Sequence, residues 1–452
     1  MTLSLTRDEL IRSQNFIAGR WCDAADAALL PVLDPADDRP ITRVPDSSAA
    51  DARAAVDAAQ AAFPAWRATP AKQRAQLLKR WNDLIVMHQE DLGRLISREQ
   101  GKPLVEGRGE VLYAASYVEW FAEEATRAYG DMIPAPVSGR RMMSVKEPVG
   151  VVAAITPWNF PAAMIARKLA PAVVDVWLAD PRVRKVTFTG STPVGKHLAR
   201  ASADTLKKLS LELGGNAPFI VFDDADLDAA VDGLMAAKFR NGGQTCVCPN
   251  RVYVHGAVHD SFVDKLAARV AALKVGPASR DDSQIGPMIN ARAVAKIARH
   301  VDDAVAKGAR LVTGGRRVRD AIADGPNYYA PTVLTGATRS MELSCEETFG
   351  PVVPVFRFDS EDEVIALAND TPFGLAAYFY TRDAARVWRV ADALESGIVG
   401  INEGALAAEA APFGGVKESG YGREGSRHGL DDYMHIKYLC QGGLAATGTS
   451  AH

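Results

Sequence analysis

The feature that most constrains the fold is a change in the sequence near Val149. From there on, short apolar runs alternate with helix-like segments, and the runs include "VGVVAAIT", "KVTF", "LSLELGG", "PFIVFD", "RVYVH" and "VVPVFRF". Apolar runs of this length are typical of strands buried on both faces. Strands that alternate with helices predict an α/β protein with mostly parallel sheets.

The segment before Val149 is expected to be largely helical. Apolar residues recur at helical spacing over residues 51–66 and 70–101, and a further helix is predicted over 109–130. The segment 70–101 is predicted to form one helix, because Gly101 followed by Pro103 is a normal helix stop. "RRMMSVKEP" and "HIKYLCQG" are strand-like.

Composition excludes several classes of protein. A chain of 452 residues exceeds one hydrophobic core, so two or three domains are expected. The net charge of −3 gives no reason to expect nucleic acid or an anionic membrane as a partner. No apolar run reaches the roughly 20 residues of a membrane span, and the polar N-terminus does not resemble a signal peptide, which predicts a cytoplasmic protein.

The five cysteines are expected to be free thiols rather than a disulfide framework. No histidine lies near Cys246 and Cys248 at ligand spacing, so no metal site is expected. Cys246 lies in "FRNGGQTCVCPN", and a thiol on such a loop, surrounded by backbone N–H groups, can act as a nucleophile. The alternative is that both cysteines are small buried hydrophobic residues.

Two further residues have functional and structural interpretations. Glu212 lies at the end of the apolar run "LELGGN", where a carboxylate has a raised pKa suited to proton transfer or else points into water. Asn159 in "TPWNFP" lies between a strand and a helix, where its amide can donate to an oxyanion or cap the helix.

Six motifs together resemble the aldehyde dehydrogenases, in the same order: "TPWNFP", "FTGSTPVG", "LELGGN", "GQTC", "EETFGP" and "PFGGVKESGYGREG". The resemblance extends from about Asn15 to Leu444. It implies an α/β, aldehyde dehydrogenase-like fold with a Rossmann-type cofactor domain (1–126 and 148–214), an α/β catalytic domain (215–426) and small β oligomerisation strands (127–147 and 427–445). A homodimer or homotetramer is also implied.

The same resemblance implies roles for individual residues. Cys246 would attack an aldehyde to give a thiohemiacetal and then, with NAD or NADP as cofactor, a thioester. Asn159 would hold the oxyanion, and Glu212 would activate the water that hydrolyses the thioester. The residues that match cofactor-binding positions are Trp158, Gly190, Ser191, Glu347 and Phe349.

Within the family, the closest resemblance is to succinate-semialdehyde dehydrogenases. Arg167 and Arg240 match positions that hold the distal carboxylate of the substrate in those enzymes, as guanidinium groups are suited to do. The alternative is that both arginines form surface or structural ion pairs. Ala407 stands where the subfamily usually has a serine, so a longer semialdehyde is also compatible.

The pair Cys246 and Cys248 suggests a redox hypothesis. A disulfide across one intervening residue closes a strained ring, is easily reduced and would reversibly block the nucleophile. The alternative is that Cys248 serves only in packing.

The resemblance is interrupted near Val174–Trp177, where we expect an internal deletion that shortens the cofactor domain. The expected missing piece includes the lysine and the acidic residue that normally meet the adenosine ribose and choose between NAD and NADP. Two hypotheses follow: a working semialdehyde dehydrogenase, or a cofactor-deficient variant that serves as an oligomer subunit or aldehyde binder with residual esterase activity.

Overall fold

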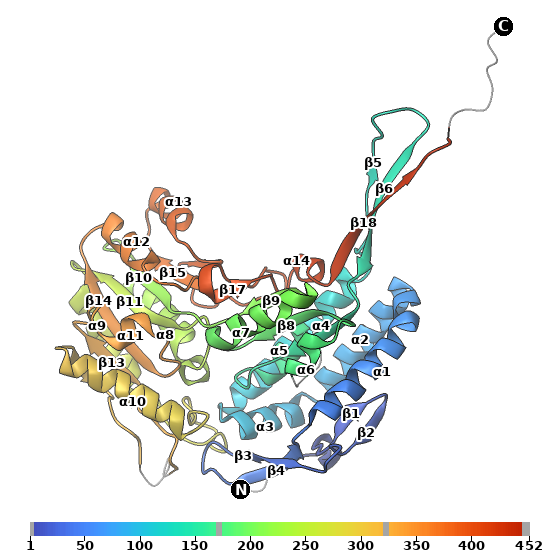
Figure 1. The fold of residues 1–452 in the computed structure, drawn as a ribbon. Coiled ribbons are helices and arrows are strands. Elements are labelled where there is room, and N and C mark those ends of the chain that lie inside the picture. The colour runs from blue at the N-terminus through green and yellow to red at the C-terminus, as the bar shows by residue number, and fades with distance from the viewer. Residues whose placement is uncertain (1–3, 169–173, 320–324, 445–452) are drawn as a thin grey trace.

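The computed structural model describes residues 4–168, 174–319 and 325–444. Two sheets with helices packed on them form the body, and a long arm of strands projects from one end (Figure 1). No helix in these ranges is both long enough and apolar enough to cross a membrane.

The larger sheet belongs to the second half of the chain. As far as the chain is described, its order is β12-β13-β14-β11-β10-β15-β16, and every pair is parallel except β12 with β13. Its strands are β10 (Ala217–Val221), β11 (Pro249–His255), β12 (Arg310–Thr313), β13 (Thr332–Thr335), β14 (Val352–Phe358), β15 (Ala376–Tyr380) and β16 (Ile398–Ile401). The apolar runs therefore form the buried parallel strands that the sequence predicts.

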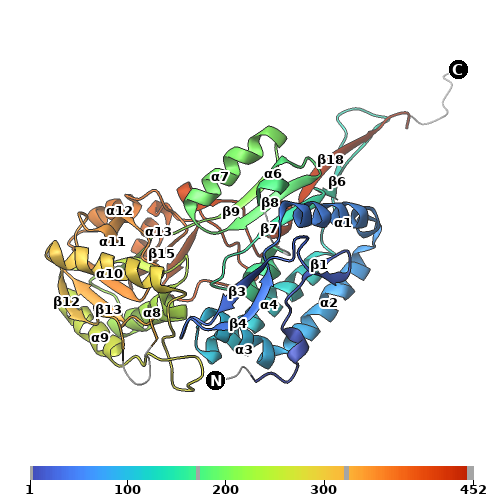
Figure 2. The same ribbon diagram turned by 60° about the horizontal axis from the view of Figure 1, so that its bottom comes forward.

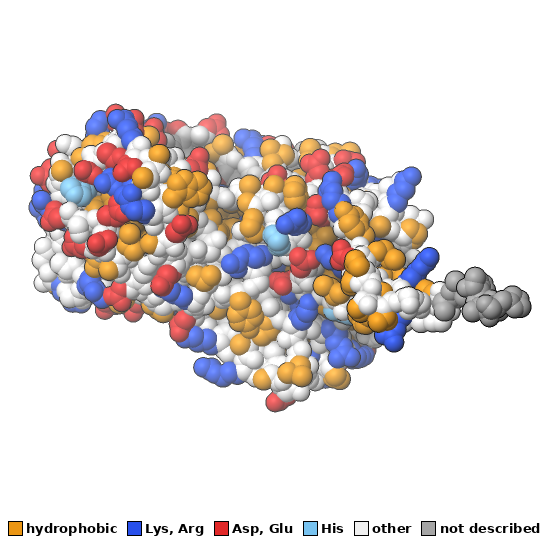
Figure 3. Space-filling model, turned by 90° about the horizontal axis from the view of Figure 1, so that it is seen from above, with side chains coloured by type: hydrophobic (Ala, Val, Ile, Leu, Met, Phe, Trp, Pro, Cys, Tyr) orange, Lys and Arg blue, Asp and Glu red, His pale blue; other side chains and the backbone are white. Residues whose placement is uncertain are grey.

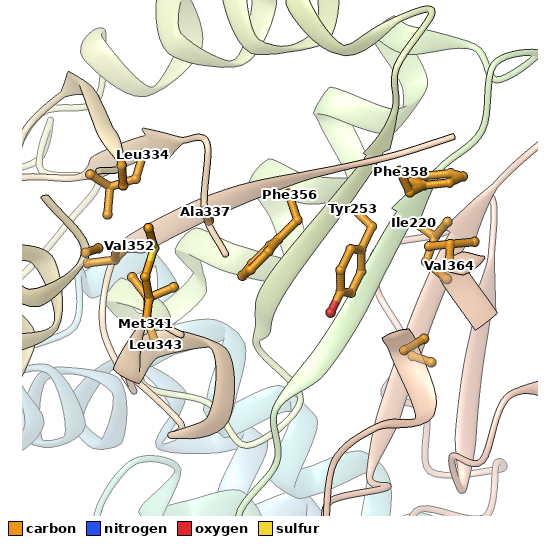
Figure 4. Close-up of a cluster of buried hydrophobic side chains, with 14 of the residues drawn as sticks. Ile220, Tyr253, Leu334, Ala337, Met341, Leu343, Val352, Phe356, Phe358 and Val364 are labelled. Carbon is orange, nitrogen blue, oxygen red and sulfur yellow. The ribbon is translucent and has the colours of Figure 1, made fainter. Parts of the chain in front are cut away.

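Helices cover this sheet and close two apolar cores. They are α8 (Leu227–Phe239), α9 (His259–Ala271), α10 (Ala291–Ala306), α11 (Glu342–Cys345), α12 (Glu361–Asn369) and α13 (Ala384–Ala393). Figure 4 shows one core, where Phe356 and Tyr253 lie between Met341 and Leu343 at one end and Ile220, Phe358 and Val364 at the other. This rigid body anchors the loops that carry the chemistry.

The smaller sheet has the order β17-β9-β8-β7 among the described residues, with β9, β8 and β7 parallel and β17 antiparallel to β9. Its elements are β7 (Val151–Ile155), α5 (Pro161–Lys168), α6 (Val174–Ala179), β8 (Val183–Thr189), α7 (Thr192–Ser202), η2 (Ala203–Thr205), β9 (Lys208–Glu212), η4 (Lys417–Ser419) and β17 (Gly420–Tyr421). The residues just before α6, where the expected deletion begins, lie outside the described residues.

The N-terminal part contains short strands and long helices. They are η1 (Asp8–Leu10), β1 (Asn15–Ile17), β2 (Arg20–Cys22), β3 (Leu29–Leu33), β4 (Pro40–Pro45), α1 (Ala49–Ala68), α2 (Ala71–Met87), α3 (Gln89–Gln100) and α4 (Leu104–Glu124). The prediction of one helix over 70–101 is wrong, because the helix breaks at His88. The buried Asp91 in the first turn of α3 accepts the backbone N–H groups of Thr6 and Arg7, which gives the second helix its own anchored start.

The predicted helix over 109–130 ends earlier, at Glu124. A Cβ atom at Gly130 would clash with the carbonyl oxygen of Ser144, so the chain there packs closely on a strand of the arm. The close approach requires a departure from the helix before Gly130.

The arm consists of β5 (Met132–Ile133), β6 (Arg141–Pro148) and β18 (Met434–Gln441), with α14 (His428–Asp431) at its base. β6 and β18 pair antiparallel along their whole length. Hydrophobic side chains lie exposed on the arm (Figure 3), among them Met132, Ile436 and Tyr438.

Candidate active site

The candidate site lies where the strands of the smaller sheet end. Asn159 follows β7, Gly190 follows β8, and Glu212 is the last residue of β9. The carboxyl ends of parallel strands meet at one edge of a sheet, which is where ligands bind in folds of this kind. Cys246 comes from the larger sheet, in the loop that precedes β11.

The loop that carries Cys246 is held by an unusual backbone. In η3 (Arg240–Gly243), Asn241, Gly242 and Gly243 have φ values of 54°, 61° and 78°. A Cβ atom at Gly215 would clash with the carbonyl oxygen of Cys246, so only glycine lets the loop after β9 pack this closely against Cys246. The thiol is thereby fixed between the two sheets.

Cys246 is protonated at rest. Desolvation, together with the carboxylates of Glu347 and Glu212, raises the pKa of its thiol to about 12, and Arg167 acts in the opposite direction. Since the thiolate is the nucleophile, the site has to remove this proton during the reaction.

Asn159 is buried beside the Cys246 loop. Its Nδ2 donates to the carbonyl oxygen of Gln244 at 3.0 Å. An amide nitrogen has two hydrogens, so a second donor remains for an oxyanion.

A buried ion pair supports the Asn159 loop. Lys102 Nζ lies 2.6 Å from Glu110 and donates to the carbonyl oxygen of Asn159 at 2.8 Å. Glu110 in turn accepts the backbone N–H of Ala162 at the start of α5. The pair therefore positions the loop that precedes α5.

Glu212 is an acid with an altered proton affinity. Its side chain is 2% exposed and neither carboxylate oxygen has a hydrogen-bond partner among the described residues. Desolvation raises the pKa of Glu212 to about 8, while Lys168, Arg167 and Arg423 act against that rise. A carboxylate with this pKa can take a proton from water near neutral pH.

Sequence reasoning missed two charged residues beside Glu212. Lys168 is buried and forms an ion pair with Glu424, and desolvation lowers the pKa of the Lys168 ammonium to about 7. Glu424 also lies 3.5 Å from Arg167, 257 positions away in the chain. The available signal was that Lys168 directly follows Arg167 and that Glu424 belongs to the motif "PFGGVKESGYGREG".

A cavity of about 70 Å³ opens beside Cys246. Arg167 and Arg240 both line it, as does Ala407, whereas Asn159 and Glu212 are not among its lining residues. The structure thus places both predicted arginines at the same cavity as the thiol.

The two arginines have different surroundings. Arg167 is buried, is hydrogen-bonded to Tyr113 and lies against Glu424. Arg240 is exposed, and its guanidinium carbon lies 4.7 Å from the ring centroid of Phe160. In the described part of the chain Arg240 forms no ion pair, so Arg240 is the arginine that can take a new carboxylate.

The predicted cofactor residues form a surface that fits a nicotinamide nucleotide. The rings of Trp158 and Phe349 meet edge to face at 5.7 Å. Glu347 Oε1 accepts the backbone N–H of Gly215 at 3.1 Å, which leaves Oε2 for a ribose hydroxyl. Desolvation raises the pKa of Glu347 to about 7.

Gly190 and Ser191 precede α7, whose N-terminus is suited to a phosphate. A Cβ atom at Gly214 would lie 3.2 Å from Glu347 Oε2 and 3.4 Å from the hydroxyl of Thr192. The carboxylate and the start of α7 therefore face each other across Gly214, where an added Cβ atom would make a tight contact with the carboxylate.

Cys248 is fully buried, and its Sγ lies 3.7 Å from the carbonyl oxygen of Lys238. Cys248 does not line the cavity that contains Cys246. A disulfide between the two cysteines stays a prediction, and it requires the loop to rearrange.

One group of potential metal ligands occurs within the described ranges, made of His300, Glu342 and Glu346. Arg299 forms ion pairs with both carboxylates, at 2.8 and 3.1 Å. The group is therefore already occupied by a cation of the chain itself.

Known proteins resemble this chain over nearly its whole length. The family model described as "Aldehyde dehydrogenase family" matches residues 21–175 and 173–439, two segments that meet at 173–175. The glutarate-semialdehyde dehydrogenase of Pseudomonas aeruginosa is 49% identical over 487 aligned positions, which cover 98% of this chain and 100% of the relative. The alignment is longer than the 452 residues of this chain, so the relative has residues with no counterpart here.

Two further proteins are similarly close. The NADP-dependent succinate-semialdehyde dehydrogenase of Escherichia coli is 48% identical, with 97% of this chain and 100% of that protein covered. The crystal structure of a succinate-semialdehyde dehydrogenase from Burkholderia pseudomallei superimposes with a TM-score of 0.95 at 51% identity, over 97% of this chain and 100% of that one. On the strength of both the sequence motifs and the fold, this chain belongs to the aldehyde dehydrogenase family.

Proposed function

We propose that the protein oxidises a carboxylate-bearing semialdehyde, such as succinate or glutarate semialdehyde, to the acid with NAD or NADP. The observation that carries this proposal is one cavity that contains both the Cys246 thiol and the Arg240 guanidinium, which has no ion-pair partner among the described residues. A thiol reacts with the aldehyde end, and a guanidinium binds a carboxylate at the other end. The two semialdehyde dehydrogenases similar to this chain support the same substrate class.

The reaction begins at Cys246. Its sulfur attacks the aldehyde carbon while the thiol proton passes to the carboxylate of Glu212, which releases it before the next step. The new oxyanion accepts hydrogen bonds from Asn159 Nδ2 and the Cys246 backbone N–H. A bound nicotinamide cofactor would supply the acceptor for the hydride of the thiohemiacetal carbon. Trp158, Phe349 and Glu347 are the residues that would hold it, with Gly190 and Ser191 at its phosphates.

Glu212 completes the reaction. Its carboxylate takes a proton from the water that attacks the thioester, and Cys246 leaves as the thiolate. Lys168, with a pKa of about 7, and its partner Glu424 give that proton a buried route away from the site. Arg167 stays paired with Glu424 and adds positive charge near the oxyanion.

The arm is proposed to pair subunits in a homodimer or homotetramer. β18 has a free edge in the described part of the chain, and its own side chains Ile436, Tyr438 and Leu439 are exposed. A free strand edge with exposed apolar side chains is a typical surface for pairing with another chain. We retain the division into a cofactor domain, a catalytic domain and oligomerisation strands as part of this proposal.

The test is to supply succinate semialdehyde, glutarate semialdehyde, butanal and pentanal with NAD or NADP, and to follow formation of the reduced cofactor. We expect kcat/KM to be at least about tenfold higher for each semialdehyde than for the neutral aldehyde of the same chain length, because one charge-assisted contact contributes about 1.5–3 kcal/mol. Equal values would show that Arg240 does not select the substrate, and no turnover with any of the four would refute the function.

A further inference from the structure

The smaller sheet contains three parallel strands among the described residues, and their spatial order simply reverses their order in the chain, β9-β8-β7. Together with α5, α6 and α7 they form one βαβαβ unit (Figure 2). In doubly wound nucleotide folds one such unit binds one mononucleotide. A dinucleotide is bound when a second unit continues from the other side of the first strand, and the crevice for the ligand lies where the strand order turns back.

Among the described residues, no strand pairs with the free edge of β7. Figure 2 shows α1 next to β7, on the side away from β9. Ala52 and Val56 of α1 share a buried core with Val151. Trp177 is 5% exposed in the same core, and its indole N–H donates to the carbonyl oxygen of Ala52 at 3.2 Å. The helix α1 and the indole ring of Trp177 therefore cover the face of the sheet next to this edge, in a core that they share with Phe188 and Leu211.

The chain between the two matched family segments is also too short for a second unit. They meet at residues 173–175. The residues 169–173, which the structure does not describe, number five, whereas a βαβ unit takes at least about 30 residues. No second mononucleotide unit fits between β7 and β8.

The unit that is present carries the residues suited to the nicotinamide side of a cofactor. Trp158 follows β7, Ser191 follows β8, and Glu347 faces the start of α7 across Gly214. These groups lie at the edge of the sheet where the carboxyl ends of its strands meet, as does Glu212. The charges of Glu347 and Glu212 both act on the Cys246 thiol, so this edge is next to Cys246.

We propose that this protein recognises its cofactor through the nicotinamide mononucleotide half alone and has no subsite for adenosine. The proposal rests on the proposed function, because the hydride acceptor has to lie beside Cys246. It follows that the 2′-phosphate that separates NADP from NAD makes no contact that affects binding.

The experiment is a calorimetric titration of the full chain with NAD⁺, NADP⁺, nicotinamide mononucleotide and 5′-AMP. We expect the first three to bind with Kd values within about fivefold of one another, which corresponds to less than about 1 kcal/mol, and 5′-AMP not to displace them. A larger difference among the three, displacement by 5′-AMP, or absence of nicotinamide mononucleotide binding would each overturn the proposal.

The Glu347→Gln variant provides a second measurement. The glutamine side chain keeps an oxygen for the Gly215 N–H but replaces a carboxylate that would bind a ribose hydroxyl of the nicotinamide half. The variant should raise the Kd values for nicotinamide mononucleotide and for NAD⁺ by the same factor. A loss confined to nicotinamide mononucleotide would show that adenosine contacts anchor NAD⁺ and would refute the proposal.

The two proposals fail in different ways. If NAD⁺ and nicotinamide mononucleotide bind equally but no semialdehyde is oxidised with either, the proposed function fails and the binding inference stands. If semialdehydes are oxidised but NAD⁺ binds far more tightly than the mononucleotide, the inference fails and the function stands.

Discussion

Replacing Arg240 by leucine tests the assignment of the substrate carboxylate most directly. Arg240 is exposed at the cavity that Cys246 lines, and its guanidinium carbon lies 4.7 Å from the ring centroid of Phe160 and 5.7 Å from that of Tyr113. No ion pair of the described residues includes Arg240, and the buried Glu106, whose pKa Arg240 helps to lower, keeps Lys102 and the backbone N–H of Asn241 after the substitution. The effect on the fold should therefore be small.

The magnitude follows from one lost charge-assisted interaction. A hydrogen bond to a charged group contributes about 1.5–3 kcal/mol, and each 1.4 kcal/mol is a factor of about ten, so we expect kcat/KM for succinate semialdehyde to fall roughly 10- to 150-fold. Arg240→Lys keeps the charge but loses the bidentate geometry of the guanidinium. Its kcat/KM for succinate semialdehyde should therefore lie between those of the wild type and Arg240→Leu.

The assay compares succinate semialdehyde with butanal, which has the same chain length and no carboxylate. The kcat/KM for butanal should change by less than about threefold in Arg240→Leu, because butanal makes no ionic contact with the protein. The matched control is Arg53→Leu, which removes an exposed arginine on the surface of α1. This variant should leave kcat/KM unchanged for both aldehydes. An equal loss for both aldehydes in Arg240→Leu would show that Arg240 supports the site rather than the substrate, and would refute the assignment.

Four further outcomes test the catalytic groups. Glu212→Gln should slow hydrolysis of the thioester about 10²–10⁴-fold, so that mass spectrometry finds the thioester on Cys246. If no thioester accumulates, Glu212 is excluded as the base. In the wild type, kcat should rise with pH toward a plateau above about pH 8, because Glu212 must be ionised. Lys168→Met removes a cation that lowers the pKa of Glu212, so the rise should move to higher pH, and a move to lower pH would contradict this role. Asn159→Ala should lower kcat about 10²–10³-fold, equivalent to about 2.7–4 kcal/mol, and a smaller loss would remove its amide from oxyanion binding. Dithiothreitol should restore the activity of the peroxide-inactivated wild type but not that of peroxide-inactivated Cys248→Ala. If the two proteins regain the same activity, the Cys246–Cys248 disulfide is ruled out.

The fold could be predicted from the sequence where periodicity is strong. Strands such as β10 and β14 are buried on both faces and therefore appear as continuous apolar runs. The break at His88 could not be predicted, because it depends on Asp91 binding the backbone of Thr6 and Arg7, a contact between distant segments. Local patterns carry no information on such contacts.

The candidate catalytic residues could be proposed from the sequence because each lies in a short motif, whereas the cluster of charges around Glu212 could not. Lys168 and Glu424 come together only through the fold, and a lysine at the end of an amphipathic helix resembles a solvated surface residue. Which of Arg167 and Arg240 is available to a substrate carboxylate also depends on the tertiary structure. Only the structure shows that Arg167 already has Glu424 as its partner.

The pairing of β6 with β18 has a consequence for synthesis of the chain on the ribosome. β6 pairs early with the short strand β5, but its other edge stays unpaired until Met434–Gln441 is made, and β9 likewise has no antiparallel neighbour until β17 is made. Contacts of such long sequence separation form late. Glu424, the counter-ion of Lys168, arrives in the same last segment. A nascent chain that stops before Gly420 therefore holds buried positive charge without its partner and an open strand edge, and the protein can complete its active site only after its final residues have emerged.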